Sequence, residues 1–379
     1  MDVSEQQQAE AELRTASAPR ADSADAEPSF FEDPAQILKT LVIVLLLVAA
    51  IYVFLPQFAG IDDALAQMGR ADRAWIGVAI ACTLIAFGSY VALFRGVVGE
   101  EDLQLRWSES YQITMAGLAA SRLFSAGGAG GIVLTYWALR KAGMERKESG
   151  ERMVAFLVVL YAVYLLALII FGVLLRVGVL PGQAPVSITV IPAAIAAAVI
   201  LVIALLAMIP RDLQDRLANR TGEGRTARIA HKLATIPATL AGGIRRAGTF
   251  MQNPSRGLSA SLGAVGFWAA NIAILWASFK ALGVTVPFGE IVQGFFVGMV
   301  ANLIPAPAGV GAVDGGLIGV FAIFGYPLGI VIAAVLIYRL IAFYLPIPPG
   351  IIAFFQLRGT VARWEAERSD GSRRTPAPI

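Results

Sequence analysis

Long apolar runs separated by short polar segments dominate the chain. A helix that crosses the hydrocarbon layer of a bilayer needs about 20 apolar residues, and five runs come close to or reach that length with almost no charge. We predict membrane spans at Leu38–Phe54, Ala74–Phe94, Met153–Leu175, Ile188–Ile209 and Gly257–Phe279. The pattern therefore predicts an all-α polytopic membrane protein.

Three further apolar segments are interrupted. Leu105–Leu139 and Phe288–Phe324 each contain a glycine-rich stretch, and Pro327–Gln356 is one long run broken at the sequence LPIPPG. Glycine and proline at membrane depth break helices, and such backbone is tolerated only where protein or a water-filled cavity satisfies it. We expect about six full spans plus two re-entrant helical hairpins.

Basic residues indicate the orientation. Lys and Arg collect in residues 140–152, in the connector 210–256 and in the tail 358–379, whereas the loops Val177–Val186 and Ala281–Gly289 carry no charge. Since basic loops stay in the cytoplasm, both termini are expected inside and the uncharged loops outside. The first hairpin then opens to the cytoplasm and the second to the outside.

Composition agrees with this class, because 57% of the residues are hydrophobic and 15% are charged, unlike a soluble domain. Residues 1–36 are acidic and predict a disordered cytoplasmic tail, which leaves 37–357 as the membrane domain. No basic start runs directly into an apolar segment, so we predict no cleaved signal and a multi-pass protein of the inner (plasma) membrane.

Several kinds of chemistry are not expected from this sequence. Cys82 is the only cysteine and His231 the only histidine, which argues against disulfides, Cys/His metal sites and nucleophile pairs that use His. There is no G-x-x-x-x-G-K-[ST] loop for ATP. We therefore expect no cofactor, no metal and no ATP hydrolysis.

The connector 210–256 carries the amphipathic stretch RIAHKLATIPATLAGGIRRAGTF. Because both of its ends are tethered to spans, we expect it to bind anionic lipid headgroups rather than nucleic acid. A plain connector is the alternative interpretation. A homo-oligomer is compatible with the sequence.

The two glycine-rich segments repeat each other. GLAASRLFSAGGAGGIVLTYWAL from Gly117 aligns with GMVANLIPAPAGVGAVDGGLIGV from Gly298, which places Ser121 opposite Asn302. Further on, VVLYAVYLLAL aligns with VLIYRLIAFYL, tyrosine on tyrosine. The predicted tips of the hairpins are at Gly128, Gly130, Pro305, Pro307, Gly309 and Gly311.

Combined with the charge pattern, the alignment makes repeat 1 (about 74–176) and repeat 2 (about 257–357) an inverted pair. Inverted repeats with broken helices are typical of secondary transporters, whose binding site lies where the repeats meet. The alternative is that the small residues only allow close contact between helices in lipid.

Few polar or ionisable residues lie near these tips, and charge at mid-membrane costs a few kcal/mol or more unless it is paired or hydrated. One interpretation is a structural ion pair of Asp314 with Arg339 or with Arg122. The other is that the guanidiniums hold an anionic group such as phosphate. A cytoplasmic Glu-Arg pair forms the entrance or anchors the interface. The candidate substrate-binding residues are Ser121, Arg122, Glu151, Arg152, Asn302, Asp314, Tyr338 and Arg339.

Three segments carry a family resemblance. NLIPAPAGVGAVDGGLIGVFAIFG, VLIYRLIAFYLPIPPGII and GGAGGIVLTYWALRKAGMERKESGERM resemble the signature of the flippase-like membrane domain family typified by the transmembrane half of lysylphosphatidylglycerol synthase. The resemblance assigns the acid of the second tip to Asp314, where the family usually has Glu, and the helix arginine to Arg339. The sequence departs at Val313, where a basic residue is common, and at Gly131, where an acid is common.

The resemblance implies a lipid translocator that moves a phospholipid or lipid-linked intermediate between leaflets. The alternative is a membrane enzyme, or an accessory subunit, for headgroup or glycosyl transfer onto a lipid carrier. No aminoacyl-transfer domain of the full synthases is present in this sequence, so the chain is not expected to make lysyl-lipid by itself.

Overall fold

The structure, a computed structural model, describes residues 61–98, 103, 105–123, 129–207, 241–249, 252, 254–303 and 311–369. All the secondary-structure elements within these residues are helices. In chain order they include α3 (Ile61–Gly69), α4 (Arg73–Val98), α6 (Trp107–Leu123), α7 (Ala129–Lys141), α8 (Arg146–Arg176), α9 (Val186–Ala207), α12 (Pro254–Ala281), α13 (Phe288–Met299), η3 (Val300–Leu303), α14 (Ala312–Ile323), α15 (Leu328–Arg339), the π-helical segment η4 (Leu340–Tyr344) and α16 (Ile347–Ser369).

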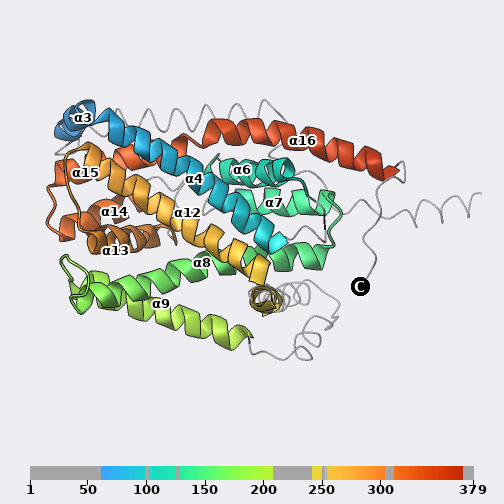
Figure 1. Cartoon of the computed structure of the whole chain (residues 1–379), viewed down its shortest axis with the longest axis horizontal. Helices are drawn as coiled ribbons and strands as arrows, with labels where there is room; N and C mark the ends of the chain where they lie inside the picture. Colours follow the sequence, from blue (N-terminus) through green and yellow to red (C-terminus); the bar gives the residue numbers. More distant parts are fainter. Residues whose placement is uncertain are drawn as a thin grey trace, which may run out of the picture.

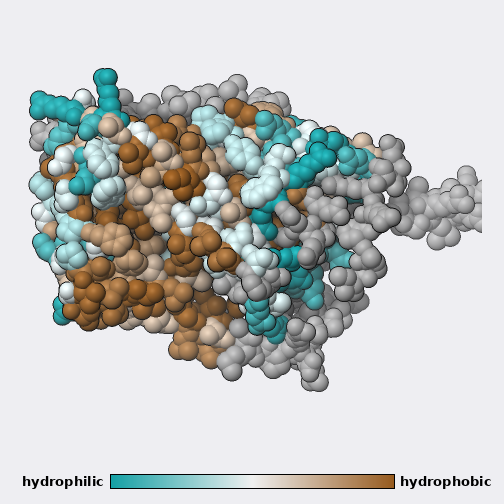
Figure 2. Space-filling model, in the orientation of Figure 1, coloured by the Kyte–Doolittle hydropathy of each residue, from teal (hydrophilic) through white to brown (hydrophobic). Residues whose placement is uncertain are grey.

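Five helical stretches among the described residues are long and apolar enough to cross a membrane. They are Arg73–Val98, Arg146–Arg176, Val186–Leu205, Ser255–Ala281 and Leu328–Ser369. Hydrophobic residues cover much of the face between the two ends of the molecule, while hydrophilic residues gather toward the ends (Figure 2). The predicted all-α polytopic membrane fold is confirmed, and the predicted span Leu38–Phe54 lies outside the described residues.

Helices α4 and α12 cross the middle of the molecule side by side (Figure 1). They run antiparallel, because the Asp72 N–H just before α4 donates to the Ala281 carbonyl at the end of α12 (2.8 Å). At the other end, the Ser259 hydroxyl of α12 donates to the Ala92 carbonyl of α4 (3.3 Å). Opposite directions for these two helices are what an inverted repeat requires.

Each half then folds into a helical hairpin, α6–α7 in the first half and α13–η3–α14 in the second. The hairpins lie toward opposite ends of the long axis (Figure 1). Gly130 lies in the first turn of α7, and Gly311 begins α14 with φ of 87°, a value that favours glycine. Both tips lie outside the described residues, and with them the predicted tip residues Gly128, Pro305, Pro307 and Gly309.

In each hairpin a glycine of the second helix lies against a glycine carbonyl of the first helix. Gly131 on α7 lies against the Gly117 carbonyl on α6, and Gly316 on α14 lies against the Gly298 carbonyl on α13. A β-carbon at Gly131 would overlap the Gly117 oxygen, so the acid that the resemblance favours at position 131 has no room. The sequence repeat aligns Gly117 with Gly298, and small residues of this kind let helices in lipid approach closely.

Two neighbouring glycines on α14 test this contact. A β-carbon at Gly316 would overlap the Gly298 carbonyl and lie 2.7 Å from the Ala301 β-carbon, whereas one at Gly315 would meet nothing within 4 Å. We expect Gly316→Ala to lower the free energy of unfolding by roughly 1–3 kcal/mol. Gly315→Ala should leave it unchanged or raise it by up to about 1 kcal/mol. Thermal unfolding in detergent compares them, and equal melting temperatures would contradict the packing argument.

The last apolar run is a helix broken in its middle, close to the predicted LPIPPG break. Pro346 has no N–H, so the Ala342 carbonyl loses its ordinary helical partner. Just before it, Leu340–Tyr344 adopts the wider π-helical register, and the Leu345 N–H donates to the Leu340 carbonyl (3.0 Å). Such π-bulges are frequent at functional sites.

Helix α16 continues past the predicted domain boundary at residue 357. Its distal part packs on α6, where the Trp364 indole N–H donates to the Glu109 carboxylate (3.2 Å) and the Thr360 hydroxyl donates to Gln112 (2.8 Å). Trp364 is only 1% exposed. Residues 358–369 therefore belong to the folded domain, and apolar anchors spaced among charged residues explain why hydropathy placed the boundary earlier.

Candidate functional site

A cavity of about 270 Å³ lies between the two halves of the molecule. Its walls come from α4, α6, α7 and α8 in the first half of the sequence and from α12, α13, η3, α14, α15 and η4 in the second half. Ser121 and Asn302, which the repeat aligns, both line it, and so do the aligned tyrosines Tyr161 and Tyr338. Residues that the repeat pairs thus share one space, as expected where inverted repeats meet.

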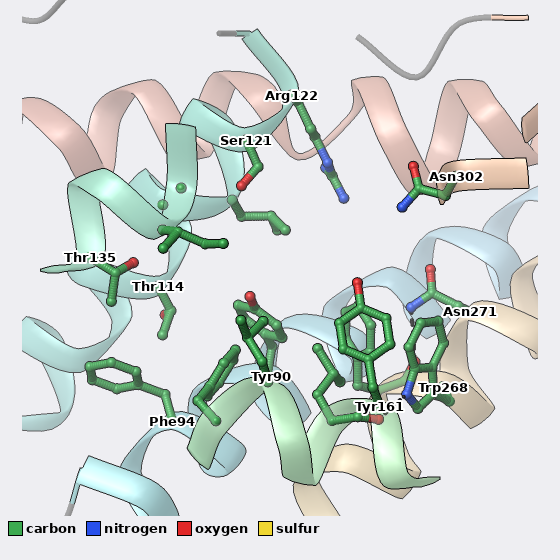
Figure 3. A pocket seen from close by; sticks show the side chains of 18 of the residues that line it. Tyr90, Phe94, Thr114, Ser121, Arg122, Thr135, Tyr161, Trp268, Asn271 and Asn302 are labelled. Atoms are coloured by element: carbon green, nitrogen blue, oxygen red, sulfur yellow. Dashed lines mark hydrogen bonds between the residues drawn. The ribbon is translucent and has the colours of Figure 1, made fainter. Parts of the chain in front are cut away.

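Figure 3 shows how the polar side chains converge. Arg122 from α6 and Asn302 from η3 point into the cavity from one side, and Tyr161 from α8 and Asn271 from α12 face them from the other. Four elements that are distant in sequence therefore supply donors and acceptors to the same volume.

Arg122 joins the first hairpin to the break in the last helix. Its Nη1 donates to the Phe343 carbonyl and its Nη2 to the Ala342 carbonyl, both at 2.9 Å. The Ala342 carbonyl is the one that Pro346 deprives of its helical partner. The guanidinium carbon also lies 5.2 Å from the centre of the Phe343 ring, within the range of a cation–π contact. Arg122 thus satisfies backbone that the break exposes.

Arg339 and Asp314 form an ion pair within the second half. The Arg339 Nε lies 2.7 Å from one Asp314 oxygen, and Nη2 donates to the other at 3.1 Å. Asp314 also accepts the Gly311 N–H at 2.9 Å, which caps the start of α14. Of the two predicted arrangements, the Asp314–Arg339 pair is the one observed. Arg339 lines the cavity, whereas Asp314 does not and reaches it only through Arg339.

Arg339 also takes part in the aromatic contact at the break. Its guanidinium carbon lies 4.5 Å from the centre of the Phe343 ring, and its side chain is 7% exposed. Two guanidiniums, those of Arg122 and Arg339, therefore meet around one phenylalanine at the same end of the cavity. Sequence alone gave no signal for Phe343.

Arg152 and Glu151 have different surroundings. Arg152 lines the cavity, donates to the Val98 carbonyl at the end of α4 and pairs with Glu148 at 2.7 Å. Glu151 does not line the cavity and instead pairs with Arg246 at 3.1 Å. Arg246 lies in the described part of the basic connector and also pairs with Glu148 at 3.1 Å, so the connector is held at this end of α8.

The charge of the lining is one-sided. Among the described lining residues there are three arginines and no Asp, Glu, Lys or His. Asp314 neutralises Arg339 and Glu148 neutralises Arg152. The partners that the described part of the chain offers to Arg122 are neutral carbonyls. The lining residues that the structure describes therefore carry a net positive charge at Arg122.

Sequence reasoning missed most of the neutral lining. The hydroxyl, amide and aromatic groups it did not single out as site residues are Tyr90, Phe94, Thr114, Thr135, Phe156, Tyr161, Phe267, Trp268, Asn271 and Phe343. A lone amide in an otherwise apolar span, as at Asn271, was the available signal. The phenylalanine residues had none, because phenylalanine in a membrane span is ordinarily in contact with lipid or core. The described residues contain no group of three or more His, Cys, Asp and Glu that could hold a metal ion.

Comparisons with known proteins agree with this architecture. A stretch of 90 residues is 32% identical to a UPF0104 membrane protein of the archaeon Methanothermobacter thermautotrophicus, covering 24% of this chain and 26% of that protein. The match thus spans about a quarter of the relative. The family model described as the lysylphosphatidylglycerol synthase TM region matches residues 37–350. That match includes both hairpins and all the described residues of the cavity lining. The chain belongs to the lysylphosphatidylglycerol synthase TM region family.

Proposed function

We propose that the protein moves a phospholipid or lipid-linked intermediate between the leaflets of the plasma membrane without hydrolysing ATP. The observation that carries this proposal is the cavity between two opposed hairpins, lined by arginine, hydroxyl and amide groups. A polar headgroup crosses a bilayer only if protein replaces its water. At about 270 Å³ the cavity is smaller than pockets for drug-sized ligands, roughly 300–1,000 Å³. It suits a headgroup whose acyl chains remain in lipid.

The cavity extends toward the end of the molecule that carries the basic loops. Its lining includes Val98 at the end of α4 and Arg152 in the first turns of α8. Because basic loops face the cytoplasm, we infer that the cavity approaches the cytoplasmic leaflet, and we propose that both termini lie on that side. Release into the other leaflet requires the outer end to open.

Two buried carboxylates in equivalent positions suit the role of latches. Glu290, 4% exposed at the start of α13, accepts the Gln183 N–H (2.6 Å) and the Tyr326 hydroxyl (2.5 Å). Glu109, 5% exposed at the start of α6, accepts the Trp364 indole N–H. The repeat register that aligns the hairpin glycines also aligns these two acids. One latch then lies at each end, and alternate opening would move the cavity between leaflets.

The outer latch is the contact of Glu290 with Gln183 and Tyr326. Removing the hydroxyl oxygen of Tyr326 should weaken it. Burial and the hydrogen bond to Glu290 hold the pKa of Tyr326 above its usual value, so its hydroxyl remains a donor across the physiological pH range. In a Cys82→Ala background, Asn302→Cys should react with a membrane-impermeant maleimide from the cytoplasmic side. Adding Tyr326→Phe should raise labelling from the outside about 10- to 100-fold, the effect of one hydrogen bond to a charged group.

Tyr111→Phe is the matched control for that experiment, because Tyr111 is 37% exposed and lies on α6 away from the outer latch. Outside labelling that rises equally in both variants would contradict the latch. Labelling of Asn302→Cys from neither side would contradict access to the cavity.

Leaflet exchange in proteoliposomes tests the function itself. The protein is reconstituted with fluorescent phospholipids, and a membrane-impermeant quencher reports the fraction in each leaflet over time. Exchange faster than in protein-free liposomes is the expected result, and no acceleration for any lipid would overturn the proposal. Transfer of a headgroup or sugar gains no support from the described lining, which contains no Asp, Glu, His or Cys.

A further inference from the structure

We infer that the cavity selects lipids whose headgroup is a single phosphodiester with neutral, hydroxyl-bearing substituents, and that it disfavours cationic aminoacylated headgroups. This inference rests on the proposed translocation and names the substrate class of the same site. It is carried by the balance of charge in the lining and by the groups that surround Arg122.

The charge balance leaves one positive charge for the ligand. Of the three arginines among the described lining residues, Arg152 and Arg339 each pair with a carboxylate that lies outside the lining, Glu148 and Asp314. Arg122 contacts neutral carbonyls in the described part of the chain. A single phosphodiester, with one negative charge, would neutralise it.

Neither hairpin tip supplies an acid that would change this count. Residues 124–128 are FSAGG and residues 304–310 are IPAPAGV. A lysyl or other amino headgroup entering the cavity would lose water and would meet guanidiniums, while the described lining residues offer it no carboxylate. Such an arrangement is strongly unfavourable in a low-dielectric space.

Arg122 keeps N–H donors for a phosphate beyond those that its structural bonds use. A guanidinium has five N–H donors in a fixed fork, and the two carbonyl contacts use one donor on each terminal nitrogen. Planar forks of this kind match phosphate oxygens better than an ammonium does. Binding to a phosphodiester therefore does not require the break in the last helix to lose its brace.

The remaining polar groups of the described lining residues are neutral. Thr114 and Ser121 on α6, Thr135 on α7, Asn271 on α12 and Asn302 on η3 line the same space. Hydroxyl and amide groups both donate and accept hydrogen bonds, which suits glycerol or sugar hydroxyls. Such a lining gives a hydroxyl-bearing headgroup partners that an ammonium, which only donates, can use only in part.

The test compares three lipids with identical fluorescent acyl chains and different headgroups in proteoliposomes of the full chain: phosphatidylglycerol, phosphatidylcholine and lysylphosphatidylglycerol. We expect phosphatidylglycerol to exchange at least about tenfold faster than the lysyl lipid, since one charge-assisted hydrogen bond is worth that factor or more. Exchange of the lysyl lipid at an equal or higher rate overturns the inference while leaving translocation intact. No exchange of any lipid overturns the proposed function as well.

A single isosteric substitution should shift the preference. Asn302→Asp adds one negative charge to the lining, so the ratio of phosphatidylglycerol to lysyl-lipid exchange should fall about tenfold, with a gain for the lysyl lipid. Gln67→Glu makes the same amide-to-carboxylate change on α3, away from the cavity, and should leave the ratio unchanged. An unchanged ratio in Asn302→Asp, with wild-type folding, overturns the inference.

A soluble phosphodiester is the other source of the same chemistry. Uptake of glycerophosphoglycerol into the same proteoliposomes distinguishes the two sources. Uptake no faster than in protein-free liposomes supports a lipid substrate, whereas uptake that matches lipid exchange overturns the assignment to lipid.

Discussion

Arg122→Gln is expected to slow leaflet exchange of phosphatidylglycerol by roughly 10- to 100-fold, because a hydrogen bond to a charged group contributes about 1.5–3 kcal/mol. The substitution removes the positive charge that no lining carboxylate of the described residues balances. Exchange of a zwitterionic lipid should fall less, since its own ammonium opposes part of the attraction. Initial rates in proteoliposomes at equal protein content measure both.

Arg122 also braces the break in the last helix, so the experiment needs a variant that separates bracing from binding. Arg122→Lys keeps the charge but loses the fork that reaches the Ala342 and Phe343 carbonyls together. We expect this variant to lose thermal stability as Arg122→Gln does, and yet to keep most of the preference for the anionic lipid. An equal fall for every headgroup in both variants would assign Arg122 a structural role only.

Much of the fold could be predicted from the sequence because bilayer thickness fixes the length of a span. The predicted span Ala74–Phe94 lies within α4 (Arg73–Val98), and Gly257–Phe279 lies within α12 (Pro254–Ala281). Hairpins were predictable because glycine and proline inside apolar sequence have few tolerated uses in a membrane. Whether the hairpins end within the bilayer stays a prediction, since it depends on where the membrane lies.

The site was predictable where a residue is both polar and repeated. Ser121 and Asn302 were found because the alignment places them opposite each other in apolar surroundings. The partners of Arg122 were not predictable, although the loss of a donor at Pro346 is visible in the sequence. Which side chain replaces that donor depends on the packing of α6 against η4, more than 200 residues away in sequence.

The sequence around Asp314 also contains a helix-capping signal. Asp314 stands three residues after Gly311, the spacing at which an acid accepts the N-cap N–H of a helix. The sequence interpretation treated it first as a charge at membrane depth. In the structure one carboxylate serves both purposes, as the cap of α14 and as the partner of Arg339.

Asp314→Asn is therefore expected to lower stability more than transport. It removes the carboxylate that neutralises Arg339, which is 6% exposed, and weakens the cap of α14. Breaking one partner of a buried pair costs about 3–5 kcal/mol, and because Asp314 is 21% exposed we expect a loss near the lower end, about 3 kcal/mol. Thermal unfolding in detergent measures it. Asp314→Glu should retain most of the stability, since an acid at this position suits a capping box.

A double-mutant cycle with Arg339→Gln isolates the pair from the cap. The double variant should be more stable than the sum of the two single losses predicts, by about 1–3 kcal/mol, because it leaves neither charge without its partner. Simple additivity would contradict a coupled pair.

The same variants also separate stability from selectivity. Asp314→Asn leaves the charge of Arg339 unneutralised beside the cavity. Its preference for phosphatidylglycerol over the lysyl lipid should therefore rise even as its melting temperature falls. A role confined to folding would lower the melting temperature and leave that preference unchanged.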